Sequence, residues 1–352
     1  MKSILALIYT FIHICIGIYY PKGGFGRVAQ ALESIAIESG VDLRLNCTVN
    51  TIQIDPTTTS ISSITYTQPS TSTNCAGKVE SGSILASKYI TNIDAPEFET
   101  QYLSESNSAV SYTDRRTASG RPSCGIVSIH FALNTTLQAL SHHTLYLSKH
   151  YRSSWATVEQ PDSARFSADS FNFYVHAPSR TDPTVCPIGH DAITVLVPVP
   201  PLPVRTDTTA TSGGDSMNSD RIVPLSEAEI AVIREAVLSR LDEMELKYCT
   251  ASTSTTSTDD THTSSSSSGS NIIPYKDIRK HIVHEHIVTP IQWHDNYSLY
   301  RGSAFGLAHQ LTQLSVLRPR LRSVIYTPLT RTLCIRIYGI LIHAYMVYSY
   351  HV

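Results

Sequence analysis

The sequence predicts a mixed α/β fold, and three features of the chain favour it. A Gly-Gly turn at Gly23 and Gly24 leads into an amphipathic helix and then into short strands. Farther along, apolar segments that partly alternate with period two end at turn-forming residues, as strands do. Ser226 and Glu229 form a capping box that opens a long helix. With 352 residues, the chain is long enough for one large or two ordinary domains.

The N-terminal elements follow one another closely. Val28, Leu32 and Ile35 lie on one face of the expected helix, and Gly40 is placed to end it. Strands are expected at 41–45, 48–54 and 84–93, with a hairpin or loose loop at 56–81. This order is typical of an α/β nucleotide-binding layer entered in its middle. No G-x-G-x-x-G fingerprint follows a strand, so the Gly-Gly turn is a weak candidate for a dinucleotide loop.

The second half alternates strands with polar insertions. Strands are expected at 124–133, 171–178, 193–199 and 281–288, and a linker at 205–220. The helix that begins near Ser226 has an apolar stripe formed by Ile230, Ile233, Val237, Leu241 and Met244. The Ser/Thr-rich insert at 250–270 cannot bury a core, and we expect it to be disordered.

Composition excludes several classes of protein. The net charge is −2 and no Lys/Arg stripe is present, so nucleic acid is not expected as a partner. Seven scattered cysteines without a C-x-x-C pair indicate reduced thiols rather than a disulfide framework or a zinc site. A secreted or anchored Ser/Thr-rich glycoprotein stays an alternative, because the chain has three N-x-S/T sequons.

Both ends of the chain are apolar. The segment 4–18 behind Lys2 is either a signal-peptide core or an element of a larger domain. The segment 335–352 is interrupted by Arg336 and His343. It is either a tail anchor or out-of-frame or intron-derived sequence, and we favour the latter.

The histidines at 281, 284 and 286 suggest a metal site, but a strand is the better interpretation. The run is rich in β-branched residues, so His284 and His286 are expected on one side of a strand. There is no H-E-x-x-H spacing and no third ligand, so no metal is predicted. His142 and His143 are expected to be solvated in a polar turn.

Five ordered blocks of the chain resemble bacterial and fungal phytoene desaturases. The first is Gly17–Phe25, which contains a Y-P-x-G-G-F pattern. The others are N-I-D-A-P at 92–96, F-Y-V-H-A-P-S-R-T-D-P at 173–183, I-T-V-L-V-P-V at 193–199, and 289–320 from T-P-I-Q-W to L-R-P-R. The Ser/Thr-rich insertions favour the fungal branch of that family.

The resemblance implies an amine-oxidase-like, two-domain flavoprotein fold. It assigns 17–100 to the middle segment of an incomplete FAD-binding domain and 101–320 to a mixed-sheet substrate domain. Residues 1–16 form an apolar lead and 321–352 a divergent tail, neither of which matches the family. The glycine fingerprint that opens the family's FAD domain and its closing glycine-rich segment are not found in the sequence.

The implied activity is FAD-dependent desaturation of phytoene, a C40 polyene, to conjugated carotenoids, impaired in a chain without the full flavin cradle. A non-catalytic remnant that binds a carotenoid or a partner is the alternative. A peripheral, intracellular attachment to a membrane surface is expected because phytoene dissolves only there. A homo-oligomer stays open.

The resemblance also assigns candidate site residues, although it identifies no catalytic residue. Gly23 and Gly24 would form a turn close to the flavin, or a tight turn without ligand contact. Val49 would lie near the adenosine half of FAD through its backbone. Pro178, Arg180 and Asp182 match a substrate-domain motif, in which Arg180 would either meet a charged or flavin group or form an Arg-Asp pair that fixes the loop.

Overall fold

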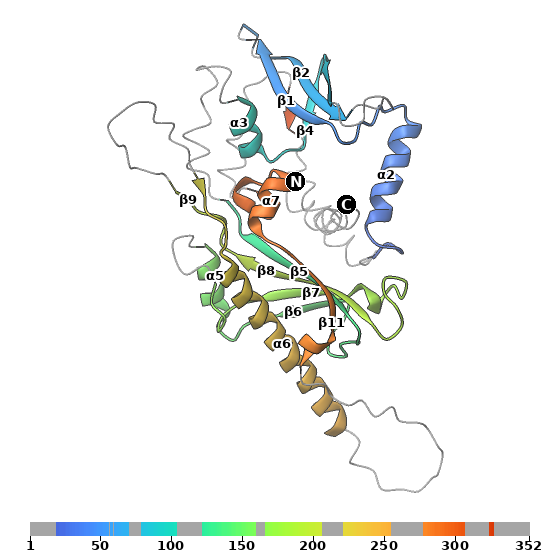
Figure 1. Ribbon diagram of the computed structural model, residues 1–352, viewed down its shortest axis with the longest axis vertical. Helices are drawn as coiled ribbons and strands as arrows, with labels where there is room; N and C mark the ends of the chain where they lie inside the picture. Colours follow the sequence, from blue (N-terminus) through green and yellow to red (C-terminus); the bar gives the residue numbers. More distant parts are fainter. Residues whose placement is uncertain are drawn as a thin grey trace, which may run out of the picture.

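The structure, a computed structural model, describes residues 19–55, 57–58, 60–69, 79–103, 122–159, 166–205, 221–254, 277–306 and 324–326 (Figure 1). Its strands are β1 (Thr48–Asp55), β2 (Ser60–Pro69), β3 (Val79–Ile84), β4 (Tyr89–Thr91), β5 (Gly125–Leu133), β6 (His143–Tyr146), β7 (Phe173–His176), β8 (Asp191–Val199), β9 (Val204–Arg205), β10 (Arg221–Ile222), β11 (Ile282–Val288) and β12 (Val324–Tyr326). Its α-helices are α2 (Gly26–Glu38), α3 (Ala95–Leu103), α5 (Tyr151–Glu159), α6 (Glu227–Ser254) and α7 (Pro290–Tyr297). Short 3-10 turns are η2 (Pro178–Arg180), η3 (Ile278–His281) and η4 (Tyr300–Gly302).

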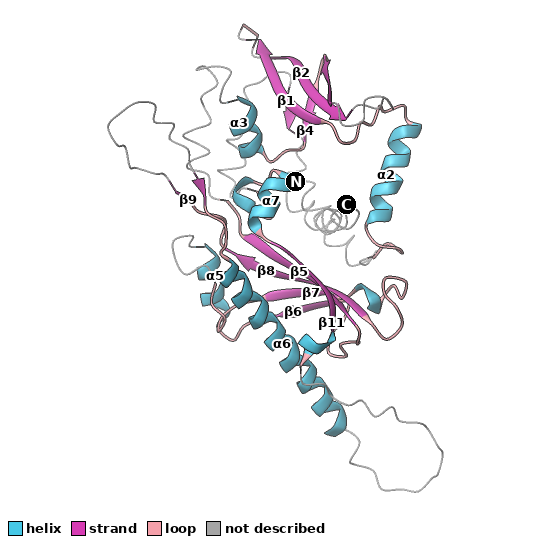
Figure 2. Ribbon diagram, viewed as in Figure 1, coloured by secondary structure: helices cyan, strands magenta, loops and turns pink. Residues whose placement is uncertain are grey.

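A five-stranded sheet in the order β11-β5-β8-β7-β6 forms the largest unit (Figure 2). Every described pair in it is antiparallel. The mixed α/β class predicted from the sequence is therefore confirmed. The mixed sheet implied for the second domain is wrong for these five strands. Consecutive β6 and β7, and β7 and β8, pair directly, although α5 lies in the first connection and η2 in the second.

One face of this sheet carries the main hydrophobic core. Alternate side chains of the central strands point to this face and are almost fully buried. Helix α6 covers it and contributes Ile233, Val237, Leu238 and Leu241 to the same cluster. The residues contributed by the strands are Val127, Ile129, Phe131, Leu133, Phe173, Val175, Ile193, Val195, Val197 and Val199. The predicted apolar stripe of this helix is thus the stripe that packs on the sheet.

Helix α6 begins at the predicted capping box. The Ser226 hydroxyl accepts from the amide of Glu229 at 3.3 Å, and the Glu229 carboxylate accepts from the amide of Ser226 at 2.7 Å. These two bonds satisfy amide groups that the first turn of a helix leaves unpaired. The sequence therefore predicted the start of this helix correctly.

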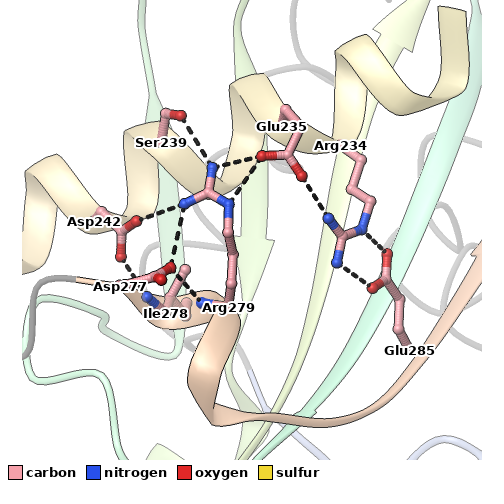
Figure 3. Close-up of polar contacts among 8 residues, drawn as sticks. All are labelled: Arg234, Glu235, Ser239, Asp242, Asp277, Ile278, Arg279 and Glu285. Carbon is pink, nitrogen blue, oxygen red and sulfur yellow. Dashed lines mark hydrogen bonds and ion pairs between the residues drawn. The ribbon is translucent and has the colours of Figure 1, made fainter. Parts of the chain in front are cut away.

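Ion pairs fix α6 to the neighbouring segment η3–β11 (Figure 3). Arg234 holds Glu285 of β11 through two bonds, from Nε at 2.6 Å and from Nη2 at 2.8 Å. Arg279 of η3 reaches back to Glu235 at 2.7 Å and to Asp242 at 3.1 Å. Bidentate guanidinium contacts of this kind set the orientation of two elements more firmly than a single bond does.

A smaller sheet of the order β1-β2-β3 lies at the other end of the molecule (Figure 1). Ile52, Ile61, Tyr89 and Phe98 form its small core with α3. The segment 56–81, expected to be a hairpin or loop, supplies β2 and the start of β3. Strand β4 pairs in parallel with β12, the one part of 321–352 that the structure describes.

Several predicted boundaries differ from the structure. Residues 41–45 are not a strand, since they form no ladder with a neighbour. The strand expected at 84–93 is instead the end of β3 and the short β4. Helix α6 runs to Ser254, into the insert expected to be disordered at 250–270. The rest of that insert, most of the linker, and the segment 1–16 lie outside the described residues. The division into domains stays a prediction.

Candidate functional site

The Gly-Gly turn is built by a sequence that permits an unusual backbone. The amide of Gly24 donates to the carbonyl of Pro21 at 2.9 Å, which closes a four-residue turn. Gly23 and Gly24 both have a φ of +83°, in the region where a side chain with Cβ is strained. Proline at the start and glycine at the positive-φ position therefore explain why the chain reverses here before α2 begins.

This turn contacts the F-Y-V-H-A-P-S-R-T-D-P block at 173–183, through a residue 159 positions away in the chain. The amide of Gly23 donates to the Asp182 carboxylate at 2.7 Å. Asp182 is buried and also accepts from the amide and the hydroxyl of Thr184, at 3.0 and 2.6 Å. These hydrogen bonds, from Thr184 first and Gly23 next, hold the pKa of Asp182 below its ordinary value, with a smaller contribution from the charge of Lys22. The structure thus brings together two of the blocks on which the resemblance rests.

Arg180 fixes its own loop through a buried aspartate. Its guanidinium holds Asp191 by two bonds, Nη1 to Oδ1 at 2.7 Å and Nη2 to Oδ2 at 2.9 Å. It also donates to the carbonyls of Leu137 at 2.6 Å and Leu140 at 2.9 Å. The hydrogen bond to Asp191 is the main reason that the pKa of Arg180 is raised. Of the two predicted roles, the structure shows the loop-fixing pair. Its partner Asp191 lies on β8, where the sequence pattern gave no signal for it.

The remaining predicted positions do not join this contact. Pro178 opens the 3-10 turn η2 ahead of Arg180. Val49 lies on β1, in the smaller sheet, and its carbonyl accepts from the Tyr102 hydroxyl at 3.3 Å. Val49 also packs against the small core formed by residues such as Ile52. A role for Val49 at a cofactor therefore stays a prediction.

A cluster of aromatic and imidazole rings surrounds the docked turn. Tyr20 lies against His142 with ring centroids 4.9 Å apart, and near His176 at 5.8 Å. The two imidazoles face each other, with Nε2 atoms 3.1 Å apart. His143 bonds the hydroxyl of Tyr174 at 2.6 Å. His142 is half-buried against Tyr20 and His176, so the expectation that it is solvated is wrong. His143 is exposed, as expected, although it lies on β6 rather than in a turn.

Histidines recur across the face of the sheet that lies opposite α6. Register pairs His286 with His130, His130 with Thr194, Thr194 with His176, and His176 with His143, so one row crosses all five strands. We call this side of the sheet, with Leu196 and Tyr174 one position along, the histidine face. This row could not be predicted from the sequence, because it depends on the order and register of five strands, and neither follows from local patterns.

Burial changes the pKa values of two residues on this face, His130 and Tyr174. His130 is 4% exposed and contacts Ser128 at 2.9 Å and Thr194 at 3.1 Å. Burial, with a smaller contribution from His286, lowers the pKa of His130 to about 4, so its ring is neutral near pH 7. Burial raises the pKa of Tyr174 to about 12. At these two positions the face therefore carries a neutral imidazole and a neutral phenol near pH 7.

The described residues contain no group of three His, Cys, Asp or Glu side chains placed to hold a metal ion. His284 and His286 lie on one side of β11, as predicted, and both are exposed. A small cavity with room for about one water molecule lies beside α5, lined by Trp155, Phe171 and Asn172 among others. Neither Gly24 nor Val49 lines it. Trp155 Nε1 is buried and has no hydrogen-bond partner among the described residues, so one water would suit this cavity.

The candidate positions do not by themselves form a site for FAD. A dinucleotide is held through free backbone amides at a glycine turn. Here the amide of Gly23 is used by Asp182 and that of Gly24 by Pro21. A Cβ on Gly24 would meet only the Tyr20 hydroxyl, at 3.6 Å. The turn therefore packs against the 173–183 block, and the amides of both its glycines are already bonded.

No family model matches the chain. Curated relatives do: the phytoene desaturase of Cercospora nicotianae is 26% identical over 310 residues, which cover 87% of this chain and 44% of that protein. The phytoene desaturase of Fusarium fujikuroi is 26% identical, covering 86% and 45%. The all-trans-zeta-carotene desaturase of Myxococcus xanthus is 23% identical, covering 92% and 49%. The chain thus spans less than half the length of these relatives.

Among solved structures, an oxidoreductase from Methanosarcina mazei aligns with a TM-score of 0.39 and 13% identity, covering 76% of this chain and 43% of that one. A likeness of this size carries no argument about the fold. The sequence relatives carry the assignment instead, because they match over most of the chain. The resemblance to the phytoene desaturase family is therefore confirmed at the level of the family.

Proposed function

We propose that the chain is the substrate-side portion of a flavin-dependent carotenoid desaturase, with a phytoene-type C40 polyene as substrate. The hydrogen bond between Gly23 and Asp182 carries the proposal, since it joins two family-like blocks into one structure. The relatives named above are carotenoid desaturases, which supports the reaction class. FAD would be the hydride acceptor when a complete flavin cradle is present.

The histidine face is the proposed wall for the polyene. The Gly-Gly turn docks at its edge through Tyr20, and Leu196 and Tyr174 lie on the same side of the sheet. The opposite face is not available, because α6 fills it. A long apolar substrate needs an extended surface, and this face crosses five strands.

Expression of the chain in cells that accumulate phytoene tests the proposal. We expect phytoene to co-purify with the chain at a higher molar ratio than with an unrelated protein of similar size. Asp182→Ala should lower that ratio, because it frees the Gly-Gly turn. Equal amounts of phytoene on the chain and on the unrelated protein would overturn the proposal.

A non-catalytic carotenoid-binding role is the second candidate, favoured by the occupied amides of Gly23 and Gly24. The same preparation separates the two roles when it is extracted for flavin and for coloured products. Flavin and conjugated carotenoids identify a desaturase. Phytoene without either identifies a binding protein.

We further propose a peripheral, intracellular attachment to a membrane surface. Helix α2 has no buried residue, and Leu32, Ile35 and Ile37 are each more than half exposed on it. None of the described helices is long and apolar enough to cross a bilayer. Sedimentation with phospholipid vesicles should therefore depend on α2. Leu32→Glu with Ile35→Glu should abolish it, and wild-type sedimentation by this variant would contradict the proposal.

A further inference from the structure

The contact between the Gly-Gly turn and the sheet is built around two imidazoles that share a hydrogen bond. His176 is 6% exposed on β7, and His142 is half-buried in the connection before β6. Their Nε2 atoms are 3.1 Å apart, so one of the two carries the hydrogen and the other accepts it. The ring of Tyr20 packs edge-on against His142 and near His176. The turn is therefore seated on this pair.

The pair of imidazoles can bind one proton without losing the hydrogen bond between the rings. His142 also contacts the hydroxyl of Thr181 through Nδ1. A protonated His142 donates through Nε2 to His176 and through Nδ1 to Thr181, whose hydroxyl accepts as readily as it donates. The bond between the two rings and the bond to Thr181 both survive.

The pair cannot bind a second proton in the same geometry. With both rings charged, each Nε2 carries a hydrogen and the two N–H groups point at each other across 3.1 Å. Two like charges at this distance repel, and burial makes the repulsion stronger than it is in water. One imidazole ring then has to rotate away from the other, and Tyr20 loses the surface against which it packs. The pair therefore distinguishes between one bound proton and two.

We propose that His142 and His176 form a proton-sensitive latch, which holds the Gly23–Gly24 turn against the sheet and releases it when both rings are charged. Its ligand is the proton, and the consequence is exposure of the Gly23 amide, which donates to Asp182 in the docked turn. The proposal does not depend on any reaction of the chain. It gives the turn two states, docked and released, with different backbone donors available.

The surroundings set the direction of the response. Among the described residues, the titratable and charged groups near the pair include Tyr20, Lys22 and Arg27 on the turn and the start of α2, His143 on β6, Tyr174 on β7, and Asp182 after η2. Burial lowers the pKa of His142 from 6.5, and the neighbouring His143 lowers it further. The released state, with ordinary histidines, binds more protons than the docked state below pH 6.5, so falling pH favours release.

Hydrogen exchange of the Gly23 amide in the full chain, followed by NMR and corrected for intrinsic exchange, tests the latch. We expect strong protection at pH 7.5 and a loss of protection below pH 6.5 of about tenfold per pH unit for each proton taken up on release. His142→Asn and His176→Asn should each reduce that slope by about one proton. His190→Asn is the matched control and should leave the slope unchanged, because the described hydrogen bond of the His190 ring goes to the Ile188 carbonyl in its own loop, at 3.1 Å.

Asp182→Asn separates the latch from a simpler cause. An asparagine side chain still offers an oxygen to the Gly23 amide but does not titrate. The slope should persist in this variant, and its disappearance would identify Asp182 as the sensor and overturn the proposal. So would an unchanged slope in both histidine variants.

Should either histidine variant not fold, imidazole ¹⁵N shifts of the wild-type chain decide the question. The rings of His142 and His176 should shift together on the first proton. Independent titration of the two rings near pH 6.5 would contradict a shared site.

Discussion

Replacement of Asp191 by alanine should destabilise the sheet more than any other single charge change in the described residues. The Asp191 side chain is fully buried and accepts four hydrogen bonds, two from Arg180, one from the Ser179 hydroxyl at 2.7 Å and one from the Leu137 amide at 2.8 Å. Alanine leaves these donors without their acceptor. Breaking a buried ion pair by removing one partner costs about 3–5 kcal/mol.

Urea unfolding followed by circular dichroism measures this cost. For a chain of 352 residues, the loss corresponds to a fall in Tm of roughly 4–7 °C. Asp42→Ala is the matched control, since Asp42 pairs with Arg44 at 2.7 Å but its side chain is 71% exposed. An exposed pair contributes about 0–1 kcal/mol.

A double variant sharpens the test. Arg180→Ala combined with Asp191→Ala removes both charges, so its cost should be smaller than the sum of the two single costs. Additive costs would show that the pair is not coupled. An Asp191→Ala cost below about 1 kcal/mol, equal to that of Asp42→Ala, would refute the assignment of Asp191 as the anchor of this loop.

Three further predictions concern other parts of the structure. The pKa of His130 is about 4 in the folded chain and 6.5 in the unfolded chain, so the free energy of unfolding should fall by about 3 kcal/mol between pH 6.5 and 4. In urea titrations, His130→Gln should flatten this pH dependence, and an unchanged curve would contradict the role of His130. A Cβ on Gly302 would lie 2.2 Å from the Pro290 carbonyl oxygen, so Gly302→Ala should yield little soluble protein. The control Gly189→Ala has open space around it and should cost about 1 kcal/mol in thermal melts. Equal yields of the two variants would show that the clash at Gly302 is relieved. Ile233→Ala should lower stability to urea by about 2–4 kcal/mol because Ile233 is fully buried, while exposed Val232→Ala on the same helix should cost under about 0.5 kcal/mol, and similar costs would argue against the packing of α6.

Local patterns predicted the elements that depend on local physics. The helix α6, its capping box and its buried stripe follow from 3.6-residue spacing and a short-range cap. Strands β5 and β8 follow from period-two alternation of apolar residues. The Gly-Gly turn follows from its residue types. None of these requires a distant partner.

Features set by distant partners were missed. Leu43 and Leu45 alternate like a strand, but no neighbouring strand pairs with them. Arg180 pairs with Asp191 rather than Asp182 because the first residue of β8 lies beside η2, and this position does not follow from local sequence. Site residues such as Val49 were assigned by resemblance alone, and geometry separates Val49 from the turn that Gly23 anchors.

Direct binding of phytoene to the purified chain is the measurement that matters most. Detergent-solubilised phytoene is titrated against the wild type, against Leu196→Glu on the histidine face, and against Val232→Glu on the outer side of α6. A saturable affinity that drops at least tenfold only with the glutamate at 196 agrees with a polyene wall on that face. No saturable binding by the wild type, or equal affinity in all three, contradicts the proposal that this chain is the substrate-side portion of a carotenoid desaturase.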